Sequence, residues 1–435
     1  MQKINKQQVQ TLKGFRDFLP AEKRKRDFIT EKVIETFENF GFEPLETPTL
    51  EYASLLLGKY GEEADKLVYN FEDRGGRKIG LRYDQTVPTA RVLAQYRGQL
   101  APAFRRYQIQ NVFRAEKPQK GRYREFTQCD CDIFASPSPI ADAEILAVYY
   151  AVFKNIGFKN IIIEVNNRKD IFDTLSTYPL FNKEGKTSPQ IWEKQIKTIS
   201  KFLQSIDKLD KLSETKVIEE LTEKEFQKDQ VIEILNTLKT AEEKQIISQE
   251  LKPIIDYAVN LGVPRKNLKY NPFMVRGLDY YTGLIFEGKI PEYTVGSVGG
   301  GGRYDNLIKE LSGVKISAVG FGIGFDRTVE AADQLSLIPD EKTSVKVLVT
   351  TYFNTEESLT VATKLRQSGI NTEVYPSAIG HLKAQFKLAD RKSIPWVVII
   401  GEEEVEKNLI SLKNMQTGEQ EQVSIEEACA TIKRI

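Results

Sequence analysis

The sequence predicts a chain of mixed α and β structure with two or three domains, and three observations support this prediction. Two runs of alternating apolar and polar residues flank a Pro- and Gly-containing break at 117–121, which is the pattern of a β-hairpin with a long tip. Residues 168–262 are rich in Lys and Glu and follow a helical period. Beyond residue 344, strand and helix patterns alternate, which is typical of a small α/β domain with a largely parallel sheet.

The remaining elements follow from apolar spacing and from Pro and Gly. A helix is expected at roughly 21–40, followed by an extended segment at 42–51, where prolines 44 and 48 exclude helix. A polar stretch at 336–344 predicts a domain boundary. The expected segments are 1–167 and 263–338, which form one domain, a helical insertion at 168–262, and a C-terminal domain at 343–435.

Composition limits the chemistry that this chain can perform. The formal net charge of +1 provides no global basic field, so contacts with nucleic acid must come from local patches. His381 is the only histidine, which argues against Ser-His-Asp triads and HExxH zinc sites. The three cysteines cannot form a disulfide framework, and no apolar run approaches the ~18 residues of a membrane span. We therefore expect a cytoplasmic protein with reduced thiols.

The hairpin at 113–134 contains an unusual set of side chains. Guanidinium groups match phosphate oxygens bidentately, and aromatic faces can stack on a base. A solvated basic loop is the alternative, but Arg114 and Phe126 lie within the expected strands rather than at the tip. The basic residues are Arg114, Lys117, Lys120, Arg122 and Arg124, interleaved with Phe113, Tyr123 and Phe126.

Two glycine-rich stretches, 299–302 and 320–324, match neither the Walker pattern nor the Rossmann pattern. Glycines within strand texture instead indicate close backbone approach to a flat ligand or to a neighbouring strand. Arg327 follows the second stretch and can project over that surface. A salt bridge at the start of a helix is the alternative interpretation of this arginine.

Residues 276–281, RGLDYY, place an arginine, an acid and two tyrosines in an apolar setting. Strand alternation would put Arg276 and Tyr280 on one face, and Asp279 and Tyr281 on the other. Core tyrosines with an internal salt bridge are the alternative. A carboxylate suits an ammonium and an arginine suits a carboxylate, so these groups could hold an amino acid. The further polar candidates are Asp84, Thr86, Gln128 and Asp132.

Essentially the whole chain resembles class II aminoacyl-tRNA synthetases, and specifically the histidyl-tRNA synthetase family. Residues 42–51 resemble motif 1, with Pro48 at the dimer interface; residues 113–134 resemble motif 2, and 320–327 resemble motif 3. Residues 276–283 and 299–305 resemble two signatures of histidyl enzymes. The resemblance implies an α+β catalytic domain with an antiparallel sheet, a helical insertion, and a C-terminal α/β anticodon-binding domain. It also implies a homodimer that joins L-histidine to tRNA(His) with ATP and Mg²⁺.

The resemblance further implies a role for each candidate residue. Arg114 and Arg276 would be catalytic, and Arg276 would do the work that a metal does in sister enzymes, so no dedicated metal ligands are expected. The ATP-binding residues would be Arg114, Glu116, Arg122, Phe126 and Arg327. The histidine-binding residues would be Asp84, Thr86, Gln128, Asp132, Arg276, Tyr280 and Tyr281, and Gln119 would contact the tRNA.

Three alternatives remain at this point. One is the synthetase-like regulatory subunit of ATP phosphoribosyltransferase, which binds histidine without catalysis. The others are a synthetase for another amino acid and a sensor domain for uncharged tRNA. The sequence departs from the family pattern at Asp132, where many members have Glu, at Ala135, where glycine is usual, and at Phe325-Asp326, where Leu-Glu is usual.

Overall fold

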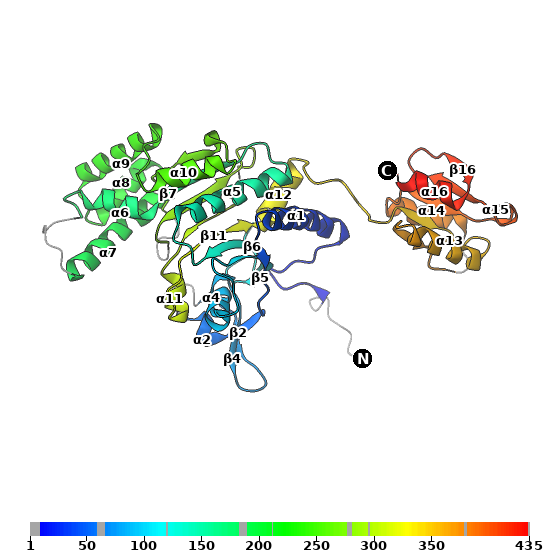
Figure 1. Ribbon diagram of the computed structural model, residues 1–435, viewed down its shortest axis with the longest axis horizontal. Helices are drawn as coiled ribbons and strands as arrows, with labels where there is room; N and C mark the ends of the chain where they lie inside the picture. Colours follow the sequence, from blue (N-terminus) through cyan, green and yellow to red (C-terminus); the bar gives the residue numbers. More distant parts are fainter. Residues whose placement is uncertain are drawn as a thin grey trace. The chain divides into compact units, whose positions relative to one another are not determined.

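The computed structural model divides the chain into two compact units: Met1–Asp17 with Asp27–Ile338, and Phe18–Arg26 with Pro339–Ile435 (Figure 1). Each unit has its own sheet and hydrophobic core. Within the described ranges, no helix combines the length and the apolar character needed to cross a membrane. The structure describes residues 9–58, 66–118, 121–181, 189–210, 212–275, 281–294, 296–377 and 381–433.

The first unit is built around an eight-stranded sheet in the order β1-β5-β6-β11-β10-β9-β7-β8. Neighbouring strands are antiparallel except at the two ends, where β1 pairs in parallel with β5 and β7 with β8. The predicted α+β class with an antiparallel sheet is confirmed. The strands are β1 (Glu43–Pro44), β5 (Arg105–Phe113), β6 (Glu125–Phe134), β7 (Ile162–Asn167), β8 (Leu268–Tyr270), β9 (Leu284–Lys289), β10 (Gly299–Arg303) and β11 (Ala318–Gly324).

The hairpin expected from the sequence is formed by β5 and β6, which pair from Arg105 opposite Ile133 to Phe113 opposite Glu125. Side chains of a strand alternate between the two faces of its sheet. On β6, the thiols of Cys129 and Cys131 lie in the hydrophobic core of the first unit. The residues between and beside them, Gln128, Asp130 and Asp132, line a cleft on the opposite face.

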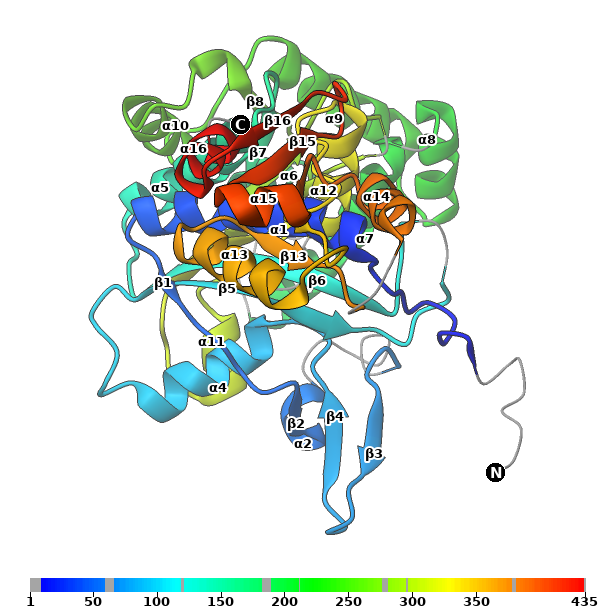
Figure 2. The ribbon, with the colours of Figure 1, turned by 90° about the vertical axis from the view of Figure 1, so that its right-hand side faces the viewer.

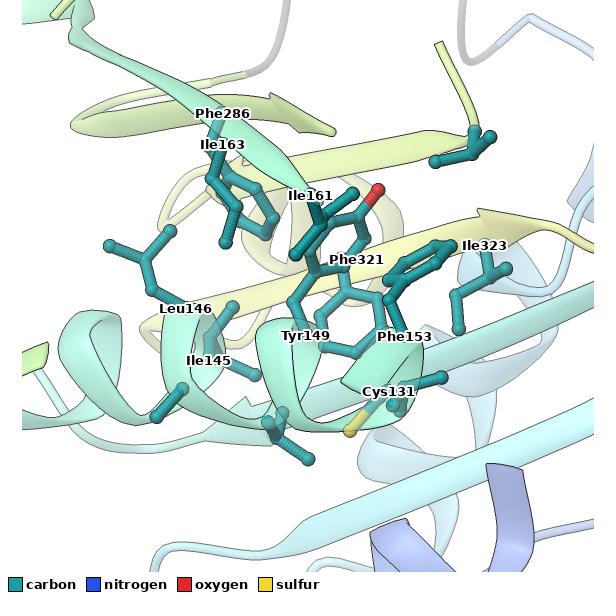
Figure 3. Close-up of a cluster of buried hydrophobic side chains, with 14 of the residues drawn as sticks. Cys131, Ile145, Leu146, Tyr149, Phe153, Ile161, Ile163, Phe286, Phe321 and Ile323 are labelled. Atoms are coloured by element: carbon teal, nitrogen blue, oxygen red, sulfur yellow. The ribbon is translucent and has the colours of Figure 1, made fainter. Parts of the chain in front are cut away.

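A layer of helices covers the core face of this sheet, and Figure 1 shows α1, α5 and α12 on the same side of β6 and β11. At the centre of the layer, the ring of Tyr149 lies 5.0 Å from those of Phe153 and Phe321 (Figure 3). The α5 helix begins after Ser138, whose side chain accepts a hydrogen bond from Ile140 N, as expected of an N-cap. The helices of this layer are α1 (Pro20–Asn39), α5 (Pro139–Ile156), α10 (Leu251–Asn260) and α12 (Phe325–Gln334).

The opposite face of the sheet has fewer helices, which leaves room for the cleft. The α4 helix (Thr86–Tyr96) and the α11 helix (Leu307–Ser312) pack against Phe134 and Tyr304 in a small cluster. A separate three-stranded sheet, β2-β4-β3, lies beside α2 (Figure 2). Its elements are β2 (Leu50–Tyr52), α2 (Ala53–Leu56), β3 (Asn70–Glu72) and β4 (Lys78–Leu81).

Between β7 and β8 the chain forms a helical segment with its own apolar core. In this core the ring of Phe202 lies 5.3 Å from that of Phe181 and 5.5 Å from that of Phe226. The last α-helix before β8, α10, packs instead in the core of the large sheet. The other elements are α6 (Arg168–Ser176), α7 (Pro189–Ile206), η2 (Asp207–Asp210), α8 (Glu214–Glu223), α9 (Lys228–Glu243) and η3 (Arg265–Asn267).

The second unit contains a five-stranded sheet in the order β13-β12-β14-β15-β16. The β12 strand pairs in parallel with β13 and with β14, as the alternating pattern predicts. The β14–β15 and β15–β16 pairs are antiparallel, so half of the pairings are parallel and the sheet is mixed rather than largely parallel. The elements are β12 (Val347–Val349), α13 (Thr355–Gln367), β13 (Thr372–Val374), α14 (Leu382–Arg391), β14 (Trp396–Ile399), α15 (Glu402–Lys407), β15 (Ile410–Asn414), β16 (Gln420–Val423) and α16 (Ile425–Lys433).

Candidate active site

A cleft of about 610 Å³ lies over the middle of the large sheet, on the face opposite α5. Its floor is formed by β6, β11 and β10, and the ends of the hairpin strands form one wall. Nine of the sequence-predicted site residues line it: Thr86, Arg114, Glu116, Arg122, Phe126, Gln128, Asp132, Tyr281 and Arg327. Residues from four distant parts of the chain therefore meet in one cavity.

Glycines of β11 make room for the polar side chains of β6. In the antiparallel register, Gly320 lies opposite Asp132, Gly322 opposite Asp130, and Gly324 opposite Gln128. A Cβ atom on Gly322 would lie 2.9 Å from Oδ1 of Asp130, and one on Gly320 would overlap the carboxylate of Asp132. The carboxylates thus lie across β11. The space beside Gly320 and Gly322 is taken chiefly by side chains of β6, whereas the sequence predicts a flat ligand or a neighbouring strand there.

One end of the cleft contains an arginine and an aromatic ring from the hairpin. The guanidinium of Arg114 lies 5.0 Å from the centre of the Phe126 ring, and its Nε donates to Tyr83 O at 3.1 Å. Arg327, from the first turn of α12, donates through Nη1 to Ser297 O at 2.9 Å. This bond fixes Arg327 at the cleft rather than in the helix-start salt bridge considered as an alternative. Two cations and a flat ring at one end suit a nucleoside phosphate.

The same end has a second group of charged residues. The side chain of Arg122 is 60% exposed, and its Nη1 lies 3.9 Å from the carboxylate of Glu116. Because most of its surface is open to solvent and this ion pair is long, the guanidinium is available to a ligand. Tyr123 is fixed by Arg16, which stacks 3.3 Å above its ring. Arg16 also forms a 2.9 Å ion pair with Asp326, which connects the hairpin to α12.

The predicted histidine-binding residues that the structure describes line the cleft, with one exception. Thr86, Gln128 and Tyr281 line the cavity, whereas Asp84 does not. Asp84 is buried, and its Oδ1 accepts a hydrogen bond from the backbone N of Val87 at 3.1 Å, in the first turn of α4. The structure therefore gives Asp84 a helix-capping contact and does not place it among the lining residues.

Asp132 lines the cleft but already has two protein partners. Nη2 of the fully buried Arg106 lies 2.8 Å from Oδ2 of Asp132, and the hydroxyl of Tyr304 donates a short hydrogen bond to Oδ1. Burial raises the pKa of Asp132, and Arg106 opposes this change. Burial also raises the pKa of Tyr304 well above its usual value, so the hydroxyl remains a donor.

Asp130 is a cleft residue that sequence reasoning missed. It is 5% exposed, lines the cavity, and lies on the same strand face as Gln128 and Asp132. Burial raises the pKa of its carboxyl to about 7; Arg106 opposes the rise, and Asp132 and Asp84 add to it. Strand alternation through Gln128 and Asp132 was the signal that could have found it.

Five of the residues singled out in the sequence lie outside those that the structure describes: Gln119, Lys120, Arg276, Asp279 and Tyr280. The predicted alternation of Arg276 and Tyr280 against Asp279 and Tyr281 therefore stays a prediction. Among the described residues, no group of three His, Cys, Asp or Glu side chains could hold a metal ion. Carboxylates that line the cleft include those of Glu116, Glu287 and Asp326.

Comparisons with known proteins agree with this geometry. A family model for histidyl-tRNA synthetase matches residues 14–327, and one for an anticodon binding domain matches residues 343–435. A histidine–tRNA ligase from Wolinella succinogenes is 39% identical over 97% of both chains. The chain belongs to the histidyl-tRNA synthetase family.

Solved structures agree with this assignment to the histidyl-tRNA synthetase family. A crystal structure of histidyl-tRNA synthetase from Nostoc sp. PCC 7120 has a TM-score of 0.82 and 30% identity, covering 99% of this chain and 100% of the other. An ATP phosphoribosyltransferase regulatory subunit/histidyl-tRNA synthetase from Bacillus halodurans has a TM-score of 0.69 and 21% identity, covering 87% and 95%. The second likeness concerns the fold alone, so the regulatory-subunit alternative is not the better supported one.

The departures from the pattern of histidyl-tRNA synthetases have structural counterparts. Ala135, where glycine is usual, has a φ of 60°, the left-handed conformation that glycine adopts at no steric cost. Asp132 reaches Arg106 and Tyr304 despite being shorter than Glu. Phe325 is buried in the core of the first unit, and Asp326 pairs with Arg16.

Proposed function

We propose that this protein is a histidine–tRNA ligase, which activates L-histidine with ATP and transfers the histidyl group to the 3′ end of tRNA(His). The observation that supports this proposal is the division of one cleft into two ends. Arg114, Phe126 and Arg327 lie at one end, where they suit ATP, and the polar residues of β6 lie at the other, where they suit an amino acid. The two substrates would therefore meet above the middle of the sheet.

Positioning and charge neutralisation are sufficient for the first step. The carboxylate of histidine attacks the α-phosphorus of ATP in line, forming a C–O–P bond as the bond to pyrophosphate breaks, and no proton is transferred. Arginines that neutralise the developing charge lower the barrier in a site that excludes water. This explains how a chain with one histidine, His381 in the second unit, performs the reaction.

We assign the roles as follows. Arg114 and Arg276 would hold the α-phosphate, Arg122 and Arg327 the outer phosphates, and Phe126 with Arg327 the adenine. Thr86, Gln128 and Asp84 would receive the ammonium group of histidine, and Asp132 with Tyr280 and Tyr281 would receive its ring. These roles rest on the cleft and on the family, with Arg276 and Tyr280 taken from the family pattern alone.

Mg²⁺ fits this site as a companion of ATP. It prefers oxygen ligands and is commonly bound through substrate phosphates and one or two carboxylates. Glu116 and Glu287 line the cleft and could supply such a carboxylate. When bound, Mg²⁺ would neutralise phosphate charge, and the arginines described above would do the same from the protein.

We also propose that the protein binds tRNA, forms a homodimer and is located in the cytoplasm. Gln119 at the hairpin tip would contact the acceptor end of the tRNA, and residues 343–435 would bind its anticodon. The extended segment that contains Pro48 would form the interface of a homodimer, as motif 1 does in the family. Reduced thiols in all three cysteines suit the cytoplasm.

Histidine-dependent exchange between ATP and pyrophosphate tests the first step. We expect the purified chain to support exchange with histidine, and Arg114→Ala to reduce it about 100- to 1,000-fold, the usual effect of removing one group that stabilises transition-state charge. The circular dichroism spectrum should stay that of the wild type. Binding of histidine by calorimetry without any exchange would instead support the regulatory alternative.

A substitution at the hairpin tip should distinguish the formation of the adenylate from the transfer of histidine to tRNA. In Gln119→Ala we expect exchange at the wild-type rate and slower transfer to tRNA, because the tip would contact tRNA and not histidine. Single-turnover transfer from preformed adenylate measures this step. A defect in exchange with normal transfer would contradict the assignment.

A further inference from the structure

Asp130 has no role in the assignments above, yet its carboxylate is in an unusual state. It is 5% exposed and faces the cleft, and its Oδ1 accepts no hydrogen bond within the described structure. Leaving a buried carboxylate oxygen without a partner costs free energy, so such groups are rare unless a ligand supplies the donor. The neighbouring Asp132, by contrast, is held by Arg106 and Tyr304.

The charges around Asp130 favour a donor or a cation as its partner. Arg106 and Arg114 act on its carboxyl as positive charges, and Asp132 and Asp84 as negative ones. Arg106 is already paired with Asp132, and the guanidinium of Arg114 lies over the Phe126 ring at the ATP end. Within the described residues, two of the charges around Asp130 are therefore acidic, and its Oδ1 has no hydrogen-bond donor.

The position of Asp130 places it beneath the bound amino acid. Residues two apart on a strand lie on one face at a separation of about 7 Å, so Asp130 is midway between Gln128 and Asp132. Gln128 is assigned to the ammonium group and Asp132 to the ring. A histidine that reaches from one to the other must therefore pass over Asp130, with Gly322 on β11 leaving the space open.

We propose that Asp130 is a further histidine-binding residue, whose carboxylate accepts a hydrogen bond from an N–H group of the bound amino acid. This inference rests on the proposed function, because it names a contact within the same site. The N–H group belongs either to the ammonium or to the imidazole ring. Both present the same donor chemistry to Asp130, and the experiment below distinguishes them.

The isosteric variant Asp130→Asn removes the charge and keeps the shape. A hydrogen bond to a charged group contributes about 1.5–3 kcal/mol, so we expect the KM for histidine in pyrophosphate exchange to rise roughly 10- to 150-fold. The KM for ATP should stay within about twofold of the wild-type value. Asp73→Asn, at the exposed turn between β3 and β4, is the matched control and should change neither constant.

A second variant, Gly322→Ala, keeps the proposal testable if Asp130→Asn does not fold. In Gly322→Ala the aspartate is retained, but the new Cβ would lie 2.9 Å from its Oδ1 and displace it, so the KM for histidine should rise again. If both variants keep the wild-type KM for histidine, the inference is wrong. If the wild-type chain shows no exchange with histidine, the proposed function itself fails, which is a distinguishable result.

Binding of 3-(imidazol-4-yl)propionate identifies the donor, because this analogue lacks the ammonium group and has no other donor in its place. Its inhibition constant is measured with the wild type and with Asp130→Asn. If the variant weakens histidine and the analogue equally, Asp130 binds the ring. If it weakens histidine alone, Asp130 binds the ammonium group. Unchanged binding of both compounds would overturn the proposal.

Discussion

Arg303 shows why a signature residue need not touch a substrate. Its guanidinium is buried and donates from Nε to Oδ1 of Asp142 at 2.9 Å and from Nη2 to Oδ2 at 2.6 Å. Nη1 also donates to Ser136 O at 3.0 Å. Because Asp142 lies in the first turn of α5, this bidentate pair connects β10 to the helix that covers the sheet.

Removing one partner of this pair should therefore be costly. We expect Arg303→Met to lower the free energy of unfolding by about 3–5 kcal/mol, because Asp142 would remain buried without its cation. Urea unfolding followed by circular dichroism measures the change. The matched control is Arg77→Met, whose ion pair with Asp73 is screened by solvent and should contribute little to stability. Equal losses in both variants would contradict this account.

At the scale of elements, glycines set how closely β10 and β11 can approach each other. Gly301 lies opposite Phe321, whose ring packs on Tyr149 of α5. A Cβ atom on Gly301 would overlap Gly320 O and lie 2.5 Å from Phe321 Cα, and both of these are backbone atoms that cannot turn away. The glycines of β10 thus allow two strands to approach each other beneath the cleft.

We expect Gly301→Ala to destabilise the first unit by about 3 kcal/mol or more, since the added methyl group must displace a strand. The control is Gly98→Ala, where a Cβ atom would have no neighbour within 4 Å. Thermal unfolding of both variants gives the comparison. A stable Gly301→Ala protein with wild-type exchange would show that the strands can separate without loss.

The sequence predicts local elements of this fold well and long-range pairing poorly. The β5–β6 hairpin follows from alternation and a Pro-Gly break, and these signals lie within thirty residues. The neighbour of β6 on its other side, β11, is far away in the chain, and no local pattern indicates that pairing. The class of the sheet could be predicted only through the resemblance to a family.

The same distinction applies to the site. Arg114, Phe126 and Gln128 could be predicted because they lie in one conspicuous hairpin. Asp132 has two partners, Arg106 and Tyr304, and neither could be predicted. Arg106 comes from β5 and Tyr304 follows β10, so they meet Asp132 only through the register of the sheet. The cleft position of Asp130 was predictable from alternation, but its lack of a partner was not.

At the scale of the whole molecule, the two units have separate hydrophobic cores, so we expect each unit to unfold on its own. The second unit has its own cluster around Leu365, Val349 and Val398, and these residues are fully buried. The cleft lies entirely in the first unit. Damage to the core of the second unit should therefore leave the adenylation chemistry intact.

We expect Leu365→Ala to destabilise the second unit by about 2–5 kcal/mol through the cavity that it creates. In urea, circular dichroism should show an earlier first transition, whereas the urea concentration that halves pyrophosphate exchange should not change. Leu359→Ala, at a position that is 49% exposed, is the control. A parallel loss of exchange in Leu365→Ala would show that the two units unfold as one.

The cysteines offer a way to follow such openings without any substitution. All three are free and buried, with Cys129 and Cys131 on β6 and Cys429 on α16. Burial raises the pKa of the Cys129 and Cys131 thiols well above the usual value, so an alkylating reagent finds no thiolate there in the closed state. The rate of alkylation at each cysteine under native conditions then reports how often the unit that contains it opens. Mass spectrometry of the labelled peptides would compare how often each part of the chain is exposed to solvent.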